Sequence, residues 1–521
     1  MKVHLTYDDR DLDAKAELPP DAAALTDDLG LDILLGAMSR GDPYLHDIAR
    51  RTLLSSLDDV VAIRYRQAAL ADCIAEPAVV RELYAITVAA IEQERRGWLF
   101  SATYPSSVLD RSIKMLRNFV VQLRRARDIR DRHAASFSSA AFSRLFRELG
   151  DEVGDDYLRS VEDHLRRLEF RDGVHLGVAL QPTGEATGHV LQRPADRRGW
   201  RDRIGLGEAQ GYTWELDPRD IAGAEALGML RGRGIALAAA AVGESADHIM
   251  AYFGQLRAEL GFYLACLNLH DGLVAKGEPV CMPDPTPAGE ATLSARGIYD
   301  VCLSIALGPA RAVGSDLEAA GKRLVVITGA NRGGKSTFLR SLGLAQLMMQ
   351  AGIFVPAVAF RGEVHRGLFT HFKREEDSAL RSGKLDEELG RMSDIVDRLT
   401  PGSLVLMNES FASTNEREGA EIGRQIVRAL LESGVRVRYV THMYDLARQL
   451  RSEHGDDAAF LRAERLSDGR RTFRLTEGEP LPTSYGQDLY RRIFGPDVGE
   501  GDPDAVPVPE MRPGSAPRAG A

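Results

Sequence analysis

The stretch that most constrains the fold of this chain is RLVVITGANRGGKSTFLRSLGLAQLMMQAG, which begins at residue 323. An apolar run that suits a buried strand leads into GANRGGKS at residues 329–336, and a helical sequence follows at once. These residues match GxxxxGKS, a motif that requires this order of strand, loop and helix. Backbone N–H groups of the glycine-rich turn and the positive end of the helix can then bind phosphate oxygens. The sequence therefore predicts an α/β domain with a phosphate site at a strand end.

The motif predicts ATP and Mg²⁺ as cofactors. Lys335 should reach the β- and γ-phosphates, and the Ser336 hydroxyl should coordinate the metal. A chance glycine loop is the alternative, but the strand, the motif and the helix all agree with a nucleotide site. The residues expected to bind nucleotide are Gly329, Ala330, Asn331, Arg332, Gly333, Gly334, Lys335, Ser336 and Thr337.

A second apolar strand, SLVLMNES at residues 403–410, ends in Asn408 and Glu409. Nucleotide hydrolases usually hold the water shell of Mg²⁺ with an Asp at such a strand end, and Asn408 stands in its place. Asn keeps an acceptor oxygen but loses the charge. We expect Asn408 and Glu409 to contact the metal through water, Glu409 to activate the attacking water, and hydrolysis to be slow. The alternatives are that Asn408 is neutral in effect and that Glu409 is an ordinary surface residue.

A third apolar strand, VRVRYVTH, ends at Thr441 and His442. The carboxyl edge of a parallel sheet is where ligands bind. We expect His442 to sense the γ-phosphate, although a lone His is more often structural.

The first half of the chain has helical periodicity from about residue 29 to 91, at 106–133 and from about 223 to 273, with short β-like pieces between about 172 and 215. Near residue 460, AAFLRAERLSDGRRTFRLTEG reads as a hairpin turned at Asp468 and Gly469. We predict four parts: an N-terminal segment (1–28), an all-α core and lever region (29–275) with a small insert at about 135–220, a P-loop ATPase domain (276–495), and a disordered tail (496–521) rich in Pro, Gly and Ala.

Composition indicates an ordinary soluble protein, with 44% hydrophobic and 27% charged residues. We see no apolar run of about 20 residues and no export signal, so we expect a cytoplasmic protein with no membrane contact. The four cysteines form no CxxC pair and suggest buried thiols. A net charge of −10 argues against a chain that coats nucleic acid everywhere, but not against a local basic groove.

Together these pieces resemble the MutS family of DNA mismatch-repair ATPases. The resemblance is carried by residues 327–357 (ITGANRGGKS through FVPA), by LVLMNESFASTNEREG at 404–419, by YVTHMYDL at 439–446 and by TSYGQDLYRRIFG at 483–495. Residues 31–74 look, more weakly, like the helical core that precedes the ATPase in that family. The resemblance implies an ABC-type P-loop ATPase domain behind a helical lever region, with Glu409 as the water-activating residue and His442 reading the γ-phosphate.

The resemblance also implies a homodimer whose ATPase domains complete each other's sites with a Ser before the second strand. Ser382 is the candidate for this contact in trans, although its register is offset by one residue, and an N-cap role is equally open. The chain begins directly at the core, so we expect no mismatch-reading domain. We also expect no C-terminal nuclease domain, and a shortened dimerisation piece.

DNA is the partner that the resemblance implies, with nucleoid association if the protein is bacterial. One basic helical stretch could contact phosphates or could be a solvated helix face. The main alternative function is a nucleotide-gated scaffold that recruits proteins and hydrolyses ATP barely or not at all. An ABC-type transporter or chromosome-structure ATPase is disfavoured because no LSGGQ-type stretch precedes residue 403. The basic residues of the helical stretch are Arg111, Lys114, Arg117, Arg124, Arg125, Arg127, Arg130 and Arg132.

Overall fold

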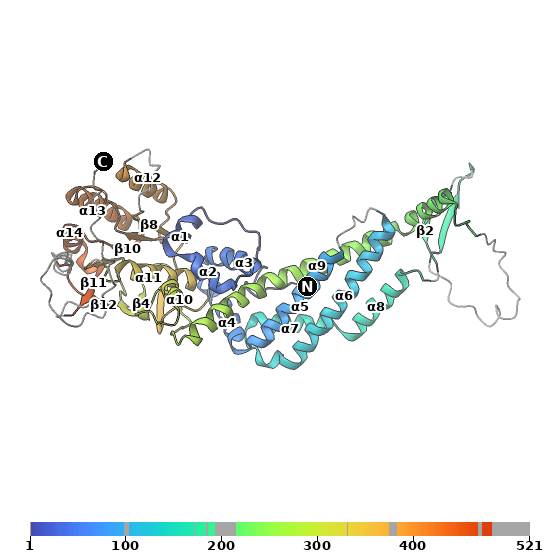
Figure 1. Cartoon of the computed structure of the whole chain (residues 1–521), viewed down its shortest axis with the longest axis horizontal. Coiled ribbons are helices and arrows are strands. Elements are labelled where there is room, and N and C mark those ends of the chain that lie inside the picture. The colour runs from blue at the N-terminus through green and yellow to red at the C-terminus, as the bar shows by residue number, and fades with distance from the viewer. Residues whose placement is uncertain are drawn as a thin grey trace, which may run out of the picture.

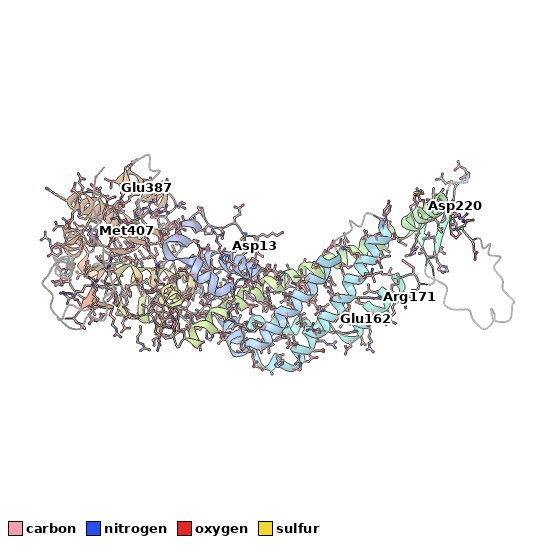
Figure 2. All side chains as sticks on the ribbon, in the orientation of Figure 1. Asp13, Glu162, Arg171, Asp220, Glu387 and Met407 are labelled. Atoms are coloured by element: carbon pink, nitrogen blue, oxygen red, sulfur yellow. The ribbon has the colours of Figure 1, made fainter. Side chains whose placement is uncertain are left out.

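The computed structural model describes residues 2–97, 104–171, 173–183, 186–192, 215–330, 332–374, 383–466 and 471–481. These residues form an elongated molecule, with a compact α/β region at one end and a long helical arm at the other (Figure 1). Figure 2 places Met407 within the α/β region and Asp220 near the far end of the arm. The expected combination of a helical region and an α/β region is confirmed.

Four helices near the N-terminus form a base between the arm and the α/β region (Figure 1). Two of them begin at aspartates whose carboxylates accept backbone N–H groups: Asp42 from Tyr44 and Leu45, and Asp59 from Val61 and Ala62. Such caps satisfy N–H groups that the helix itself cannot. The helices are α1 (Ala22–Leu29), α2 (Leu31–Ser39), α3 (Pro43–Leu54) and α4 (Val60–Ala75).

The arm is built on one long helix, α9 (Ile221–Ala275), whose 55 residues span about 82 Å at 1.5 Å per residue. Helices α5 and α6 pack along it, and α6 covers almost the residues predicted for the second helical stretch. The other arm elements are α5 (Pro77–Gly97), α6 (Pro105–His133), the short 3-10 helix η1 (Ala134–Ser136), α7 (Ala140–Glu152), α8 (Asp155–Leu168) and the antiparallel pair β1 (Leu176–Leu180) and β2 (Ala186–Leu191).

No structure was predicted for the first part of the insert expected at about 135–220, and it forms α7 and α8. Buried apolar residues recur in α7 at helical spacing, from Phe142 through Leu145 and Phe146 to Leu149. The β-like pattern is confirmed at β1 and β2, and residues 193–214 lie outside the described part of the chain.

Helix α9 is long and apolar enough to cross a membrane by length and composition alone, and only 17% of its most apolar window is buried. The sequence analysis did not predict such a helix, because small residues supply much of the apolar character of α9, as in IALAAAAVG. Its C-terminal half, however, packs in the core of the helical region and carries the buried carboxylate of Glu259. The absence of membrane contact stays a prediction.

The α/β region contains a six-stranded sheet in the order β12-β11-β6-β10-β9-β8. All neighbouring strands are parallel except β12, which pairs antiparallel with β11 as the hairpin prediction requires. The predicted turn at Asp468 and Gly469 lies outside the described residues. The three apolar runs of the sequence analysis are β6, β9 and β10, which confirms the α/β assignment. The strands are β6 (Leu324–Thr328), β8 (Leu368–Phe372), β9 (Leu404–Asn408), β10 (Arg436–Val440), β11 (Ala458–Arg465) and β12 (Arg471–Glu477).

A second sheet of four strands, in the order β3-β7-β4-β5, was not predicted. Its strands are short, and only β5 alternates strictly between buried and exposed residues, over four positions, so no sustained period marks them. Its strands are β3 (Asp284–Thr286), β4 (Leu293–Ile298), β5 (Ser315–Glu318) and β7 (Ala359–Glu363). The helices of the α/β region are α10 (Val301–Ala306), α11 (Lys335–Gln350), α12 (Lys384–Val396), α13 (Glu416–Glu432), α14 (Tyr444–His454) and the 3-10 helix η3 (Gly455–Asp457).

One hydrophobic core runs without interruption from the arm through the base to one face of the six-stranded sheet. Polar contacts join the base to the C-terminal end of α11, which is the helix that follows the phosphate loop. The Arg66 guanidinium donates to the carbonyl of Ala351 (2.9 Å), and the backbone N–H of Leu57 donates to the carbonyl of Gln350 (2.9 Å). These contacts connect α11 to the helices that carry the arm. As expected, the cysteines are free thiols, with Cys281 half-buried and the rest buried.

The N-terminal segment is fastened to α9 by the fully buried Glu259. Its carboxylate accepts the backbone N–H groups of Leu5 (2.7 Å), Thr6 (2.8 Å) and Leu12 (3.0 Å). Glu259→Ala leaves these donors buried without an acceptor, so we expect a loss of about 3 kcal/mol or more in the free energy of unfolding. Thermal and urea unfolding measure the loss, with the exposed Glu244→Ala on the same helix as the control. Equal unfolding midpoints for the two variants would show that Glu259 does not fasten the segment.

Candidate nucleotide site

The strand order brings the predicted site residues to one edge of the six-stranded sheet. Strands β6, β10 and β9 are parallel neighbours, so their carboxyl ends lie side by side. The phosphate loop follows β6, His442 follows β10, and Asn408 ends β9. Because β10 lies between the other two strands, His442 emerges between the loop and Glu409.

The phosphate loop needs glycine at two positions where the hairpin β11–β12 presses on it. Gly329 has φ 118°, and a Cβ there would lie 2.8 Å from the backbone nitrogen of Ala463. Gly334 has φ 89°, and its Cβ would lie 3.0 Å from the carbonyl oxygen of Phe473. Side chains are disfavoured at such φ values and have no room there. The hairpin β11–β12 therefore packs directly against the phosphate loop.

Lys335 is buried at the start of α11, with 4% of its surface exposed. Its ammonium donates to the carbonyls of Gly329 (2.9 Å) and Ala330 (3.1 Å) on its own loop. Burial lowers the pKa of Lys335, while the carboxylate of Glu409 opposes this and the guanidinium of Arg471 adds to it. A partly desolvated cation at the start of a helix that follows a glycine-rich loop suits the binding of phosphate.

Ser336 and Asn408 meet across the site, where the Ser336 hydroxyl donates to the side-chain carbonyl oxygen of Asn408 (2.9 Å). The amide oxygen of Asn408 therefore faces the hydroxyl predicted to bind Mg²⁺. These two oxygens and the Glu409 carboxylate are hard donors of the kind that Mg²⁺ takes together with water and phosphate oxygens. The residues present fit the metal, with one negative charge fewer than an Asp would give.

Glu409 leaves β9 in a left-handed conformation (φ 54°), and its N–H donates to the carbonyl of Val440 (2.8 Å). Its carboxylate lies 3.8 Å from Nδ1 of His442, which is an electrostatic contact rather than a hydrogen bond. His442 lowers the pKa of Glu409 most; burial opposes this, and Lys335 and Lys373 add to the lowering. The structure thus holds Glu409 as a carboxylate beside the phosphate loop.

Sequence reasoning missed a group of arginines on the hairpin that covers the loop. Arg462, Arg465 and Arg471 line a cavity of about 280 Å³ next to Gly329, Ala330 and Gly333. A larger cavity of about 750 Å³ adjoins it, since Glu464 and Thr476 line both. The hairpin was predicted, but nothing in a single sequence indicates that β11 pairs with β6 and so carries these arginines to the loop.

Two predicted site residues, Asn331 and Ser382, lie outside the described residues, as do the TSYG stretch and the tail. The other predicted loop residues lie at the same edge of the sheet as Glu409 and His442. The basic stretch on α6 is largely occupied by ion pairs within the arm: Arg117 with Glu169, Arg124 with Glu162, and Arg127 with Asp155. Carboxylates that follow or lie on α8 therefore neutralise much of the charge that could have faced DNA.

Comparison with known families gives two matches along the chain. The sequence model of the MutS2 N-terminal domain matches residues 58–276, and that of MutS domain V matches residues 325–497. The chain belongs to the MutS family. The first match covers the arm and part of the base, and the second covers the six-stranded sheet with the phosphate loop, Glu409 and His442. The predicted resemblance is therefore confirmed, and it extends to the MutS2 branch of this family.

Similar proteins include members of both branches. The chain is 33% identical over 179 residues to the "Endonuclease MutS2" of Thermus thermophilus (34% of this chain, 23% of that protein). It is 34% identical over 178 residues to the "DNA mismatch repair protein MutS" of Thermotoga neapolitana (34% and 22%). It is 38% identical over 125 residues to the protein of that name from Thermotoga sp. strain RQ2 (24% and 16%). The chain aligns with less than a quarter of each of these MutS-family proteins.

Proposed function

We propose that this chain is a MutS-type ATPase that binds ATP with Mg²⁺ and couples its nucleotide state to DNA binding, in DNA repair or recombination. The observation that carries the proposal is the meeting of Lys335, Ser336, Glu409 and His442 at one edge of a parallel sheet. Family membership supports the DNA-related part. The α/β region is proposed to be an ABC-type P-loop domain within residues 276–495, and the helical core and lever region within residues 29–275.

Each group at the sheet edge has a role in the proposed hydrolysis. The loop N–H groups and Lys335 bind the phosphates, and the arginines of the hairpin add positive charge near them. Glu409 orients and deprotonates the attacking water, and His442 contacts the γ-phosphate. Ser336, Asn408 and Glu409 are the residues that would hold Mg²⁺, which when bound would neutralise phosphate charge. The larger cavity, which adjoins the loop cavity at Glu464 and Thr476, is proposed to take the base and ribose.

Coupling to DNA is proposed to run through the contacts between α11 and the base. The phosphate loop leads into the N-terminal end of α11. Arg66 and Leu57 contact the C-terminal end of that helix. The base and the arm share one hydrophobic core, so a change at the loop can alter the angle of the arm. We further propose a homodimer through the ATPase domains, with Ser382 acting in trans, and a cytoplasmic, nucleoid-associated location.

Equilibrium titration with a fluorescent ATP analogue, with and without Mg²⁺, tests the binding half of this proposal. We expect saturable binding that unlabelled ATP competes away. Absence of binding at millimolar nucleotide would overturn it.

A change at Asn408 is expected to increase turnover. Asn408→Asp restores a carboxylate beside Ser336, which holds metal-bound water better than an amide does. We expect ATP hydrolysis to rise about tenfold and half-maximal activity to need less Mg²⁺. Steady-state hydrolysis over a Mg²⁺ series measures both quantities, and the isosteric swap is itself a small perturbation. An unchanged rate and Mg²⁺ dependence would mean that Ser336 and the phosphates suffice for the metal.

A nucleotide-gated scaffold is the second candidate function, and Asn408 is the observation that favours it. With the charge missing, the ATP-bound state is long-lived, and such a state could recruit other proteins. Turnover separates the two candidates, because a scaffold would hydrolyse no more ATP than a variant without its catalytic carboxylate.

DNA binding is expected to show little preference for a mismatched duplex. The two matched domains cover the arm and the ATPase, and contacts from these to the DNA backbone position a protein without reading bases. We expect matched and mismatched duplexes of one length to bind within about threefold of each other at fixed salt. Competition binding measures the ratio, and a preference above about tenfold, or about 1.4 kcal/mol, would reveal a base-reading element.

A further inference from the structure

The backbone around Glu409 is held in an unfavourable conformation. Glu409 (φ 54°) and Phe411 (φ 63°) are both left-handed non-glycine residues, and Ser410 lies between them. Such residues persist only where the surroundings fix them, and they cluster at functional sites. Ser410 joins these two residues, so its contacts bear on how the backbone at Glu409 is held.

Ser410 is fully buried and fixed through its carbonyl and its hydroxyl. The hydroxyl of Tyr439 donates to the carbonyl of Ser410 (2.9 Å). The Ser410 oxygen lies 2.7 Å from Nδ1 of His371 and 2.8 Å from the carbonyl oxygen of the same residue. The single hydrogen of this hydroxyl is thus shared between two acceptors that both belong to His371, on the neighbouring strand β8.

His371 is in turn fixed by α12 and by Phe411. Its Nε2 lies 3.0 Å from the carbonyl oxygen of Glu388 on α12, and its ring stacks on Phe411 at 5.3 Å between centroids. Because a carbonyl only accepts, Nε2 carries the proton. Burial lowers the pKa of His371 to about 4, so the ring is neutral and Nδ1 is the acceptor that faces Ser410. The tautomer is thus set by α12, and it suits the Ser410 hydroxyl.

We propose that His371 is a positioning residue that holds the Glu409 carboxylate in place through Ser410, with α12 as its anchor. The inference rests on the proposed role of Glu409. His371 is fully buried and contacts Phe411 and Ser410. It therefore acts on the orientation of Glu409 and not on the nucleotide itself. Loss of the imidazole is then expected to slow the chemical step and to leave ATP binding unchanged.

The test compares turnover and ATP binding of the full chain in His371→Leu, Ser410→Ala and the double variant. We expect each single variant to lose about tenfold or more in kcat, because small misplacements of a catalytic group are costly, with the ATP Kd within about twofold of the parent. The double variant should lose no more than the worse single variant, since both changes break one unit. Unchanged kcat in His371→Leu, losses that multiply in the double variant, or a Kd that shifts as much as kcat would each overturn the proposal.

His365 supplies the matched control. It is also a buried histidine with a pKa lowered by burial to about 4, but it contacts the carbonyl of Gly402, which precedes β9 at the opposite edge of the sheet. His365→Leu should reduce thermal stability as His371→Leu does and keep kcat within about twofold of the parent. An equal loss of kcat in both variants would mean that His371 contributes only to the stability of the core and does not position Glu409.

A measurement without turnover separates this inference from the proposed function. Nitrogen NMR of histidine-labelled protein should show His371 neutral with its proton on Nε2, and Ser410→Ala should shift the Nδ1 resonance. A proton on Nδ1, or no shift in Ser410→Ala, contradicts the inference. Failure of the proposed function would show itself separately, as a Glu409→Gln variant that hydrolyses ATP like the parent.

Discussion

Lys335→Ala is expected to abolish ATP hydrolysis and to weaken ATP binding by about 100-fold or more. The ammonium of Lys335 is buried at the mouth of the phosphate loop, where no other described lysine takes its place in the hydrogen bonds to Gly329 and Ala330. Phosphate oxygens in this loop lose the cation that faces them, and the remaining N–H groups alone do not balance their charge. Titration with the fluorescent ATP analogue and steady-state hydrolysis measure the two losses.

Lys322→Ala is the control for this variant, because Lys322 lies just before β6, at the other end of the strand, and donates to the carbonyl of Asp456. We expect it to bind ATP like the parent. ATP should also raise the unfolding temperature of the parent and of Lys322→Ala but not of Lys335→Ala, since a ligand stabilises only the form that binds it. Equal nucleotide affinity in Lys335→Ala and the parent would refute the assignment of the loop.

Glu409→Gln is expected to remove turnover while ATP binding is retained. Gln keeps the shape of Glu409 at its left-handed position but cannot accept a proton from water, so we expect a loss of about 100-fold or more in kcat. The lowered pKa of Glu409 keeps the carboxylate ionised at neutral pH. Protonation of this base should therefore reduce the rate only as the pH falls below its ordinary value of 4.5.

Single-turnover hydrolysis measures the chemical step directly, and Glu416→Gln, an exposed Glu in the first turn of α13, is the matched control. The control should hydrolyse ATP at the parental rate. A Glu409→Gln variant with parental kcat would mean that another group activates the water.

Much of the α/β region could be predicted because its signals are local. Strand β6, the glycine loop and α11 are contiguous in sequence, and the apolar runs of β9 and β10 end at the residues that reach the sheet edge. The parallel order then brings Asn408, Glu409 and His442 to the loop without further information. Long helices such as α6 and α9 were found for the same reason, since their periodicity is continuous.

The features that were missed depend on contacts between distant segments. In the second sheet β4 pairs with β7, although α11 lies between these strands in the sequence. The arginines of β11 and β12 reach the loop only because β11 pairs with β6. Ion pairs between α6 and carboxylates such as Glu162 offset positive charge on the basic stretch, and a single sequence does not show these pairings. The role of His371 is of the same kind, because Ser410 and Glu388 are far from it in sequence but touch it in the fold.

The most direct test of the central claim is steady-state ATP hydrolysis by the full chain, alone and with plain, mismatched and branched DNA, against Lys335→Ala and Glu409→Gln as backgrounds. We predict slow Mg²⁺-dependent hydrolysis above both backgrounds that DNA changes severalfold, with matched and mismatched duplexes acting alike. Hydrolysis no faster than in Glu409→Gln, or a rate that no DNA alters, would contradict an ATPase coupled to DNA.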